Sequence, residues 1–332
     1  MRLLLISSIY ILSFTLIQSC YKEQVIFDSN PNSILELPLI LKLNNKHCSF
    51  DAVSNTLRYS IEHNSITNFE AYVEFQEYSE IYFDDYLLKN YDVNNFGDIH
   101  IGEEYNVLIK TEENIQEVKL KFTNLPIVQV ITHDEIIDEP ATLARMIINY
   151  PLISKNPISS YISIEHRGGA SQIYFKKSFG FSFLNSSIIS DVIPKSIFNL
   201  PQNTSWWLDA MYIDKARLRN KTSFQIWEAM NPNINYAISS YFVELYINSM
   251  HVGLYCINQL INAEFLDLST NDAVLYKAIN WEGTMFDSYS SEISTTKYWD
   301  GWEQKFPDKN DYINWGPLAN LRDAVVNSSD ED

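Results

Sequence analysis

The chain has 332 residues and a formal net charge of −18, from 24 basic and 42 acidic side chains. This acidity argues against nucleic acid as a partner and against adhesion to anionic lipid headgroups. The six histidines are scattered without a pair at ligand spacing, so we predict no zinc site. Aromatic residues make up 14% of the chain, which favours a strand-rich protein with a substantial core.

The first 20 residues are typical of a bacterial lipoprotein signal. Arg2 supplies a positive charge, an apolar run extends from Leu3 to Ile17, and Ser19 precedes Cys20. The run is shorter than the ~20 apolar residues of a membrane-spanning helix. We therefore predict that residues 1–19 are removed and that a lipid on Cys20 anchors the protein to a membrane of the cell envelope, outside the cytosol. The alternative is a plain secretory signal with a coincidental cysteine.

The next part of the chain predicts a tether followed by a small β-sandwich. Residues 20–33 are mostly polar and include Pro31, as in a flexible linker. Short apolar segments separated by turn residues then occupy residues 34–125, where alternation indicates half-buried strands. The expected strands are Leu37–Leu43, Leu57–Ile61, Ala71–Phe75, Tyr105–Ile109 and Val118–Phe122, and Ile127–Ile131 follows beyond the domain boundary.

Residues 126–332 form a second predicted domain. Strands are expected at Tyr161–Arg167 and Phe175–Phe183, on either side of a glycine-containing loop. A helix is expected after Asp214, a suitable N-cap, and up to about Met230. A hairpin should then pair residues 242–247 with 252–257. This order of elements predicts the α+β class.

Lys177 lies on a strongly aromatic face of the predicted strand, alternating with Phe179, Phe181 and Phe183. Burying an ammonium group without a partner is costly, so this face must offer an anion or a route to solvent. In one interpretation the anion is a nucleotide phosphate, supported by Gly168, Gly169 and Ser171 of the loop. In the other interpretation Lys177 reaches solvent from the edge of the sheet or forms an internal salt bridge.

The residues of this region resemble the CotH kinase family, named after a spore coat protein. The first resemblance covers residues 162–172 and continues in Phe175–Phe179, a pattern of Arg-Gly, hydroxyl residues and a lysine pair. Further matches follow in the family's order, at Trp207–Asp214, Leu218–Asn220, Glu244–Asn248, Gly253–Tyr255, Leu275–Lys277 and Trp302–Pro307. An ordered series of this length is specific, although no single segment is.

The resemblance implies an atypical, secretory-kinase-like protein kinase fold that uses ATP and a divalent metal, Mg, to phosphorylate serine in exported proteins. In this interpretation Arg167, Gly168 and Ser171 form the phosphate loop, and Lys177 is the strand lysine that holds the nucleotide phosphates. Lys277 is a second cationic candidate, with a surface lysine as its alternative. Exported or surface proteins are the expected substrates or ligands.

Two residues are candidates for positioning the lysine. Glu228 on the predicted helix offers a carboxylate, although a solvated glutamate is the interpretation that we favour. Gln259 stands where the family carries a glutamate, and its neutral amide bonds a lysine without neutralising it. Asn220 is predicted to be buried on the same helical stripe as Phe224 and Trp227.

The family's catalytic and metal-binding aspartates are expected beyond a segment that resembles residues 321–332, so we identify no catalytic or metal-binding residue. The leading hypothesis is therefore a CotH-type kinase lipoprotein whose chain is incomplete at the C-terminus. A second hypothesis is a non-catalytic binding or scaffold lipoprotein, a pseudokinase. A third is that the isolated chain is unstable because half a domain exposes a sheet edge and an apolar face.

Overall fold

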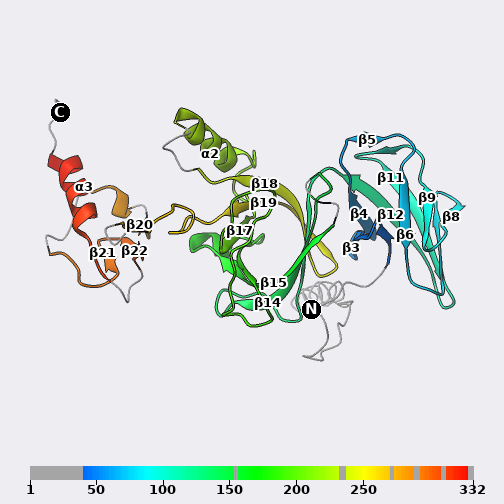
Figure 1. Ribbon diagram of the computed structural model, residues 1–332, viewed down its shortest axis with the longest axis horizontal. Coiled ribbons are helices and arrows are strands. Elements are labelled where there is room, and N and C mark those ends of the chain that lie inside the picture. The colour runs from blue at the N-terminus through cyan, green and yellow to red at the C-terminus, as the bar shows by residue number, and fades with distance from the viewer. Residues whose placement is uncertain are drawn as a thin grey trace, which may run out of the picture.

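The computed structural model describes residues 40–152, 154, 156–231, 237–269, 273–280, 282–286, 292–307 and 312–327. The predicted signal, Cys20, the tether and the first three residues of the strand predicted at Leu37–Leu43 lie outside these residues. The described part is mostly β with few helices, and it contains a closed barrel and several sheets (Figure 1). No helix among the described residues is long and apolar enough to cross a membrane.

Twelve short strands form an N-terminal unit from residue 42 to residue 123. They are β1 Lys42–Leu43, β2 Lys46–His47, β3 Ser49–Asp51, β4 Thr56–Ser60, β5 Ser65–Ile66, β6 Glu70–Glu74, β7 Ser79–Phe83, β8 Tyr86–Leu87, β9 Asp92–Asn95, β10 Ile99–His100, β11 Glu104–Thr111 and β12 Ile115–Thr123. One sheet has the order β2-β1-β6-β9 and a second has the order β3-β4-β12-β11-β7-β8, while β5 and β10 form a separate pair.

The two larger sheets of the N-terminal unit share one core. Val73 of β6 comes from the first sheet, and Leu57 of β4 and Leu120 of β12 come from the second. Apolar and polar residues alternate along these strands, and every second side chain of a strand points to the same face, so the apolar side chains of both sheets meet in one core. The edge-to-face contact between Phe83 and Phe96, with ring centroids 4.9 Å apart, adds directional aromatic packing.

The chain then forms a closed seven-stranded barrel in the order β13-β14-β15-β16-β17-β19-β18. Its strands are β13 Ile127–Ile131, β14 Thr142–Asn149, β15 Ile158–Arg167, β16 Ser178–Leu184, β17 Ser205–Asp209, β18 Ser240–Ile247 and β19 Met250–Gln259. The barrel closes where β13 runs parallel to β18, with Val128 opposite Leu245. Side chains fill the interior, among them the fully buried Phe183, Trp206 and Tyr255.

The structure confirms the predicted hairpin, in which β18 and β19 pair directly. It corrects the strand expected at Phe175–Phe183, because β16 begins only at Ser178 and Phe175 is 90% exposed. A short 3₁₀ helix, η1 Ala170–Ile173, takes up part of the preceding loop. Alternation of aromatic residues extended the prediction too far, since it does not show where strand pairing starts.

The predicted helix also begins later than expected. Helix α2 spans Arg219–Met230, and Leu218 occupies its N-cap position. Asp214 instead caps a turn, in which its carboxylate accepts from the backbone N–H of Ala216 at 3.1 Å. Arg217 has a φ of 56°, and this left-handed residue separates the turn from the helix. Asn220 is exposed and not buried as predicted, because α2 buries no side chain.

A third small unit follows the barrel and lies at the opposite end of the molecule from the N-terminal unit (Figure 1). Its elements are β20 Leu275–Ala278, η2 Glu282–Thr284, β21 Tyr298–Trp299, β22 Trp302–Phe306 and α3 Gly316–Asn327, with sheet order β20-β22-β21. Trp299, Trp315 and Leu318 form a core of their own. This core is separate from the barrel interior.

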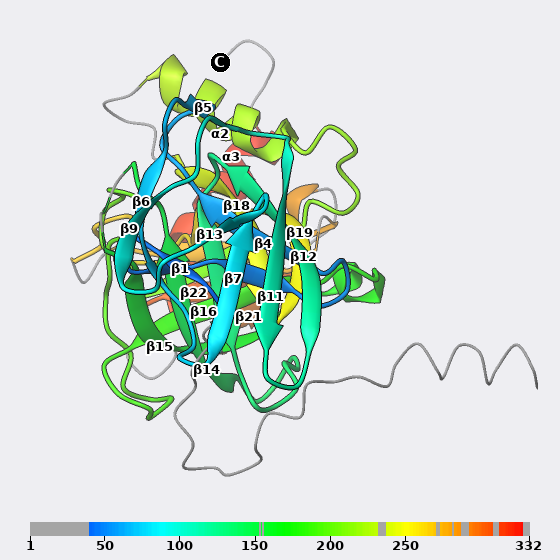
Figure 2. The same ribbon diagram turned by 90° about the vertical axis from the view of Figure 1, so that its right-hand side faces the viewer.

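A polar network joins the N-terminal unit to the barrel. Arg58 of β4 lies 3.5 Å from Glu244 of β18 and donates to Nδ1 of His251 at 2.7 Å. Nε2 of His251 lies 2.5 Å from the Glu244 carboxylate, so a ring protonated on Nε2 bridges the two charges. Viewed from the N-terminal unit, the sheet that contains β4 and β12 lies in front of the barrel strands (Figure 2). The network therefore fixes the sheet against the barrel wall.

The carboxylate of Glu244 carries the pH dependence of this network. Burial acts to raise its pKa, but the hydrogen bond and charge of His251 and the charges of Arg58 and Lys176 lower it below the ordinary value. A carboxyl with a lowered folded-state pKa stabilises the fold above its unfolded pKa. That stabilisation is lost as the pH falls below about 4.5, the ordinary value, through the folded-state pKa.

We predict that Glu244→Gln lowers the free energy of unfolding by about 1–3 kcal/mol at pH 7, because Arg58 loses its anion. The loss stays below that of a fully buried pair because the two side chains are 21% and 17% exposed. Urea unfolding at pH 7 and pH 4 measures it, and the gap between wild type and variant should narrow at pH 4. Glu104→Gln, which breaks the exposed pair with Lys121, is the control and should change little. Equal losses of stability in Glu244→Gln and Glu104→Gln would contradict the role of Glu244 in holding the N-terminal unit against the barrel.

Candidate functional site

The loop between β15 and β16 has a conformation that requires glycine at position 168. Gly168 has a φ of +116°, and a Cβ built there would lie 1.9 Å from Oγ of Ser171. Nε2 of Gln172 donates to the backbone oxygen of Gly168 at 2.6 Å and to Oδ1 of Asp138 at 2.8 Å. Left-handed backbone and these two hydrogen bonds hold the loop folded back on itself.

Lys177 closes this loop from its C-terminal end. Its ammonium donates to the backbone oxygen of Gln172, five residues earlier. Its own backbone oxygen accepts from the hydroxyl of Tyr255 at 2.9 Å, which ties the loop to β19. Lys177 therefore precedes the strand and does not lie on its aromatic face, contrary to the prediction.

Lys176 is the lysine that points toward the barrel, and the sequence analysis did not single it out. Its ammonium donates to the backbone oxygens of Ala210 at 3.1 Å and Leu254 at 2.5 Å. It lies 4.1 Å from the ring centroid of Tyr255. Burial lowers the pKa of Lys176 to about 8, and the charge of Arg217 lowers it further. Two carbonyl bonds and a cation–π contact make it a structural link between β17 and β19.

Arg167 ends β15 and extends over Trp207 of β17, with its guanidinium carbon 4.3 Å from the ring centroid. Gly180 of β16 lies between these two strands, opposite Trp207, and a Cβ there would be in ordinary van der Waals contact with Cδ of Arg167 at 4.0 Å. Nη1 of Arg167 is buried and has no hydrogen-bond partner among the described residues. Burial lowers the pKa of Arg167, and Asp209 opposes the shift. A flat cation with an open donor is suited to an anion.

Asp209, at the end of β17, is a further residue of this site that the sequence analysis did not identify. One carboxylate oxygen accepts from Met211 N at 2.9 Å and the other from Nδ2 of Asn220 at 3.2 Å. Its charge acts on both Arg167 and Lys176. The only sequence signal was its position directly after the matched Trp207-Leu208 pair. Asp209 links the barrel rim to the start of α2.

The structure brings together only part of the predicted site. Arg167, Gly168, Ser171 and Lys177 lie on one loop and its flanking strand end, and Ser171 is exposed. Glu228 is exposed on α2, and no ion pair among the described residues joins it to a lysine.

The two remaining candidates lie elsewhere. Gln259 is 1% exposed and donates to the backbone oxygen of Pro201 at 3.4 Å, so it does not hold Lys177. Lys277 belongs to β20 of the C-terminal unit and is exposed. The predicted Cys20 anchor lies outside the described residues. Within the described residues, no group of three or more histidine, cysteine, aspartate or glutamate side chains is arranged to hold a metal ion.

A glycine loop, a stacked arginine with an open donor and Lys177 form a candidate anion-binding site at the end of β15. The family model described as CotH kinase protein matches residues 164–332, half of the chain. The chain therefore belongs to the CotH kinase family, and the predicted resemblance is confirmed. The match begins within β15 and includes the Gly168 loop and α3. No curated protein matches the chain.

We predict that Gly168→Ala lowers the free energy of unfolding by about 1–2 kcal/mol, because alanine is strained at a φ of +116° and must displace Ser171. Urea unfolding with circular dichroism measures the change. Gly169→Ala is the matched control, since a Cβ there meets nothing within 4 Å. It should shift stability by less than about 0.5 kcal/mol. If both variants behave alike, the left-handed glycine does not determine the loop.

Proposed function

We propose that this chain is a CotH-type atypical protein kinase that binds ATP at the Gly168 loop and transfers phosphate to serine of exported proteins. Membership of the CotH family supports a kinase-related, transferase-like function. The observation that carries the assignment of the site is Nη1 of Arg167, the residue directly before that loop, which is buried and has no hydrogen-bond partner among the described residues. A phosphate oxygen would satisfy this donor with a charge-assisted hydrogen bond. In this proposal the barrel forms the nucleotide-binding part of a secretory-kinase-like fold.

The described residues fit the phosphates better than they fit a metal. Trp207 holds the guanidinium of Arg167 flat, and Lys177 can exchange its bond to the Gln172 carbonyl for one to a phosphate oxygen. The family uses ATP with a divalent metal, which neutralises phosphate charge when it is bound. We assign no metal ligand among the described residues, because no group of three or more of their histidine, cysteine, aspartate or glutamate side chains is arranged to hold a metal ion.

The cellular setting of the proposal rests on the sequence. A lipid on Cys20 would tether the protein to a membrane of the cell envelope, where exported or surface proteins are its expected substrates. A tethered domain meets such neighbours at high effective concentration. The acidic net charge of −18 favours partners other than nucleic acid.

A second candidate function is nucleotide binding without transfer, as in a pseudokinase scaffold. The observation that favours it is Gln259, which is buried, bonded to the Pro201 carbonyl and uncharged where the family carries a glutamate. Incubation with γ-labelled ATP, magnesium and serine peptides separates the two functions. Labelled peptide that disappears in Lys177→Ala supports the kinase, whereas ATP binding without labelling supports the scaffold.

We predict that Arg167→Ala weakens ATP binding by roughly 10- to 100-fold, because the phosphates lose a charge-assisted donor. Isothermal titration calorimetry with ATP, in the presence and absence of magnesium, measures the affinity. Arg219→Ala is the matched control, since Arg219 is exposed and paired with Asp214. Unchanged affinity in Arg167→Ala, or no ATP binding by the wild type, would contradict the proposed site.

A further inference from the structure

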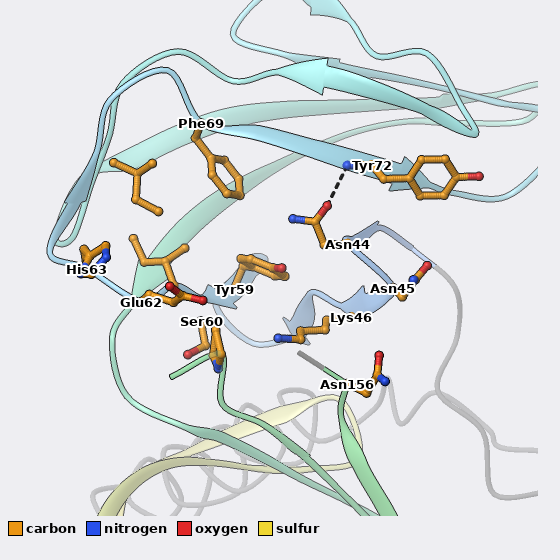
Figure 3. A pocket seen from close by; sticks show the side chains of 13 residues that line it. Asn44, Asn45, Lys46, Tyr59, Ser60, Glu62, His63, Phe69, Tyr72 and Asn156 are labelled. Atoms are coloured by element: carbon orange, nitrogen blue, oxygen red, sulfur yellow. Dashed lines mark hydrogen bonds between the residues drawn. The ribbon is translucent and has the colours of Figure 1, made fainter. Parts of the chain in front are cut away.

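A separate pocket of about 860 Å³ lies where the N-terminal unit meets the barrel (Figure 3). Its walls come from the β1–β2 turn, the end of β4 with the turn that follows, the segment from β5 to β6, and Pro151 and Asn156 of the barrel. None of its lining residues belongs to the Gly168 loop. The volume falls within the roughly 300–1,000 Å³ range of small-molecule sites.

Lys46 places a buried positive charge in this pocket. The residue is 5% exposed, and its ammonium donates to the backbone oxygen of Ser154 at 3.2 Å. No carboxylate of the described residues lies within ion-pair distance of it. Burial lowers the pKa of Lys46, and the longer-range charge of Glu62 opposes this shift only in part. A buried ammonium without a counterion is costly, so a bound anion would stabilise this arrangement.

Uncharged groups around Lys46 match a ligand that has both hydroxyl groups and an apolar face. Oδ1 of Asn44 accepts from the backbone N–H of Tyr72 at 2.9 Å, and its amide nitrogen donates to the Tyr59 hydroxyl, which leaves one N–H of Nδ2 for a ligand in the cavity (Figure 3). The side chain of Asn156 lies across the pocket from it. Tyr59 is held by its hydrogen bond to the Leu43 carbonyl at 3.0 Å and presents a fixed aromatic surface. Amides bond hydroxyl groups, and aromatic rings pack against the C–H face of a sugar.

The charges select the kind of anion. Glu62 lines the same pocket as Lys46, so a ligand with two negative charges would be repelled by the carboxylate while it is attracted by the ammonium. A single carboxylate balances Lys46 and leaves Glu62 free to accept hydrogen bonds from hydroxyl groups. We propose that this pocket binds a sugar acid, with its carboxylate on Lys46 and its hydroxyl groups on the asparagine amides and Glu62. This site does not depend on the proposed kinase function.

The test is isothermal titration calorimetry of the full chain with glucuronate, glucose and glucose 6-phosphate at pH 7. Glucuronate should bind at least tenfold more tightly than glucose and more tightly than glucose 6-phosphate. Lys46→Met should abolish the preference for glucuronate over glucose. Lys42→Met is the matched control, because Lys42 lies on the adjacent strand β1 and pairs with Glu74 at 3.4 Å. It should keep the preference.

Several results would overturn the proposal. Equal binding of glucuronate and glucose, or no binding of glucuronate, would show that Lys46 is not an anion site. Glucose 6-phosphate as the tightest ligand would contradict the assignment of a carboxylate. If Lys46→Met does not fold, Asn156→Asp replaces it, because Asn156 is exposed at the rim. This added negative charge should weaken glucuronate binding more than glucose binding, and an equal effect on both would overturn the proposal.

Discussion

Strand β13 pairs in parallel with β18, and this pairing closes the seven-stranded barrel. Closure leaves no unpaired edge and places β15, β16, β17 and β19 around one interior. The residues at the ends of these strands then meet at one rim, although they are far apart in the sequence. Arg167 at the end of β15 stacks on Trp207, whose neighbours Trp206 and Leu208 face the interior, whereas Tyr255 lies in the interior and donates to the backbone oxygen of Lys177.

The outer wall of the barrel also determines how the N-terminal unit is held. Glu244 and Tyr246 point outward from β18, while Val243 and Leu245 fill the interior. Arg58 of β4 reaches these outward side chains, and Ser60 Oγ donates to the Leu125 carbonyl at 2.8 Å beside them. The same junction forms the pocket that contains Lys46. Two candidate sites thus depend on one barrel, one at the rim and one at the wall.

Much of the strand content could be predicted from the sequence, because alternation directly reports which side chains face a core. The hairpin of β18 and β19 and the strands β4, β6, β11, β12 and β13 follow from it. The closed barrel could not be predicted, since β14 and β17 showed no pattern that sets their neighbours. Whether Lys176 or Lys177 points toward the barrel depends on the residue at which β16 begins. The stacking of Arg167 on Trp207 depends on the register of β15, β16 and β17 across Gly180. Neither is a local property of the sequence.

The central claim is that the rim around the Gly168 loop is the nucleotide site of this CotH family member. Hydrogen–deuterium exchange with and without ATP and magnesium tests it most directly, because it reports which backbone amides the ligand protects. We expect slower exchange in residues 167–177 and 207–209, with little change in the C-terminal unit. Protection confined to other segments, or no protection at saturating ATP, would contradict it.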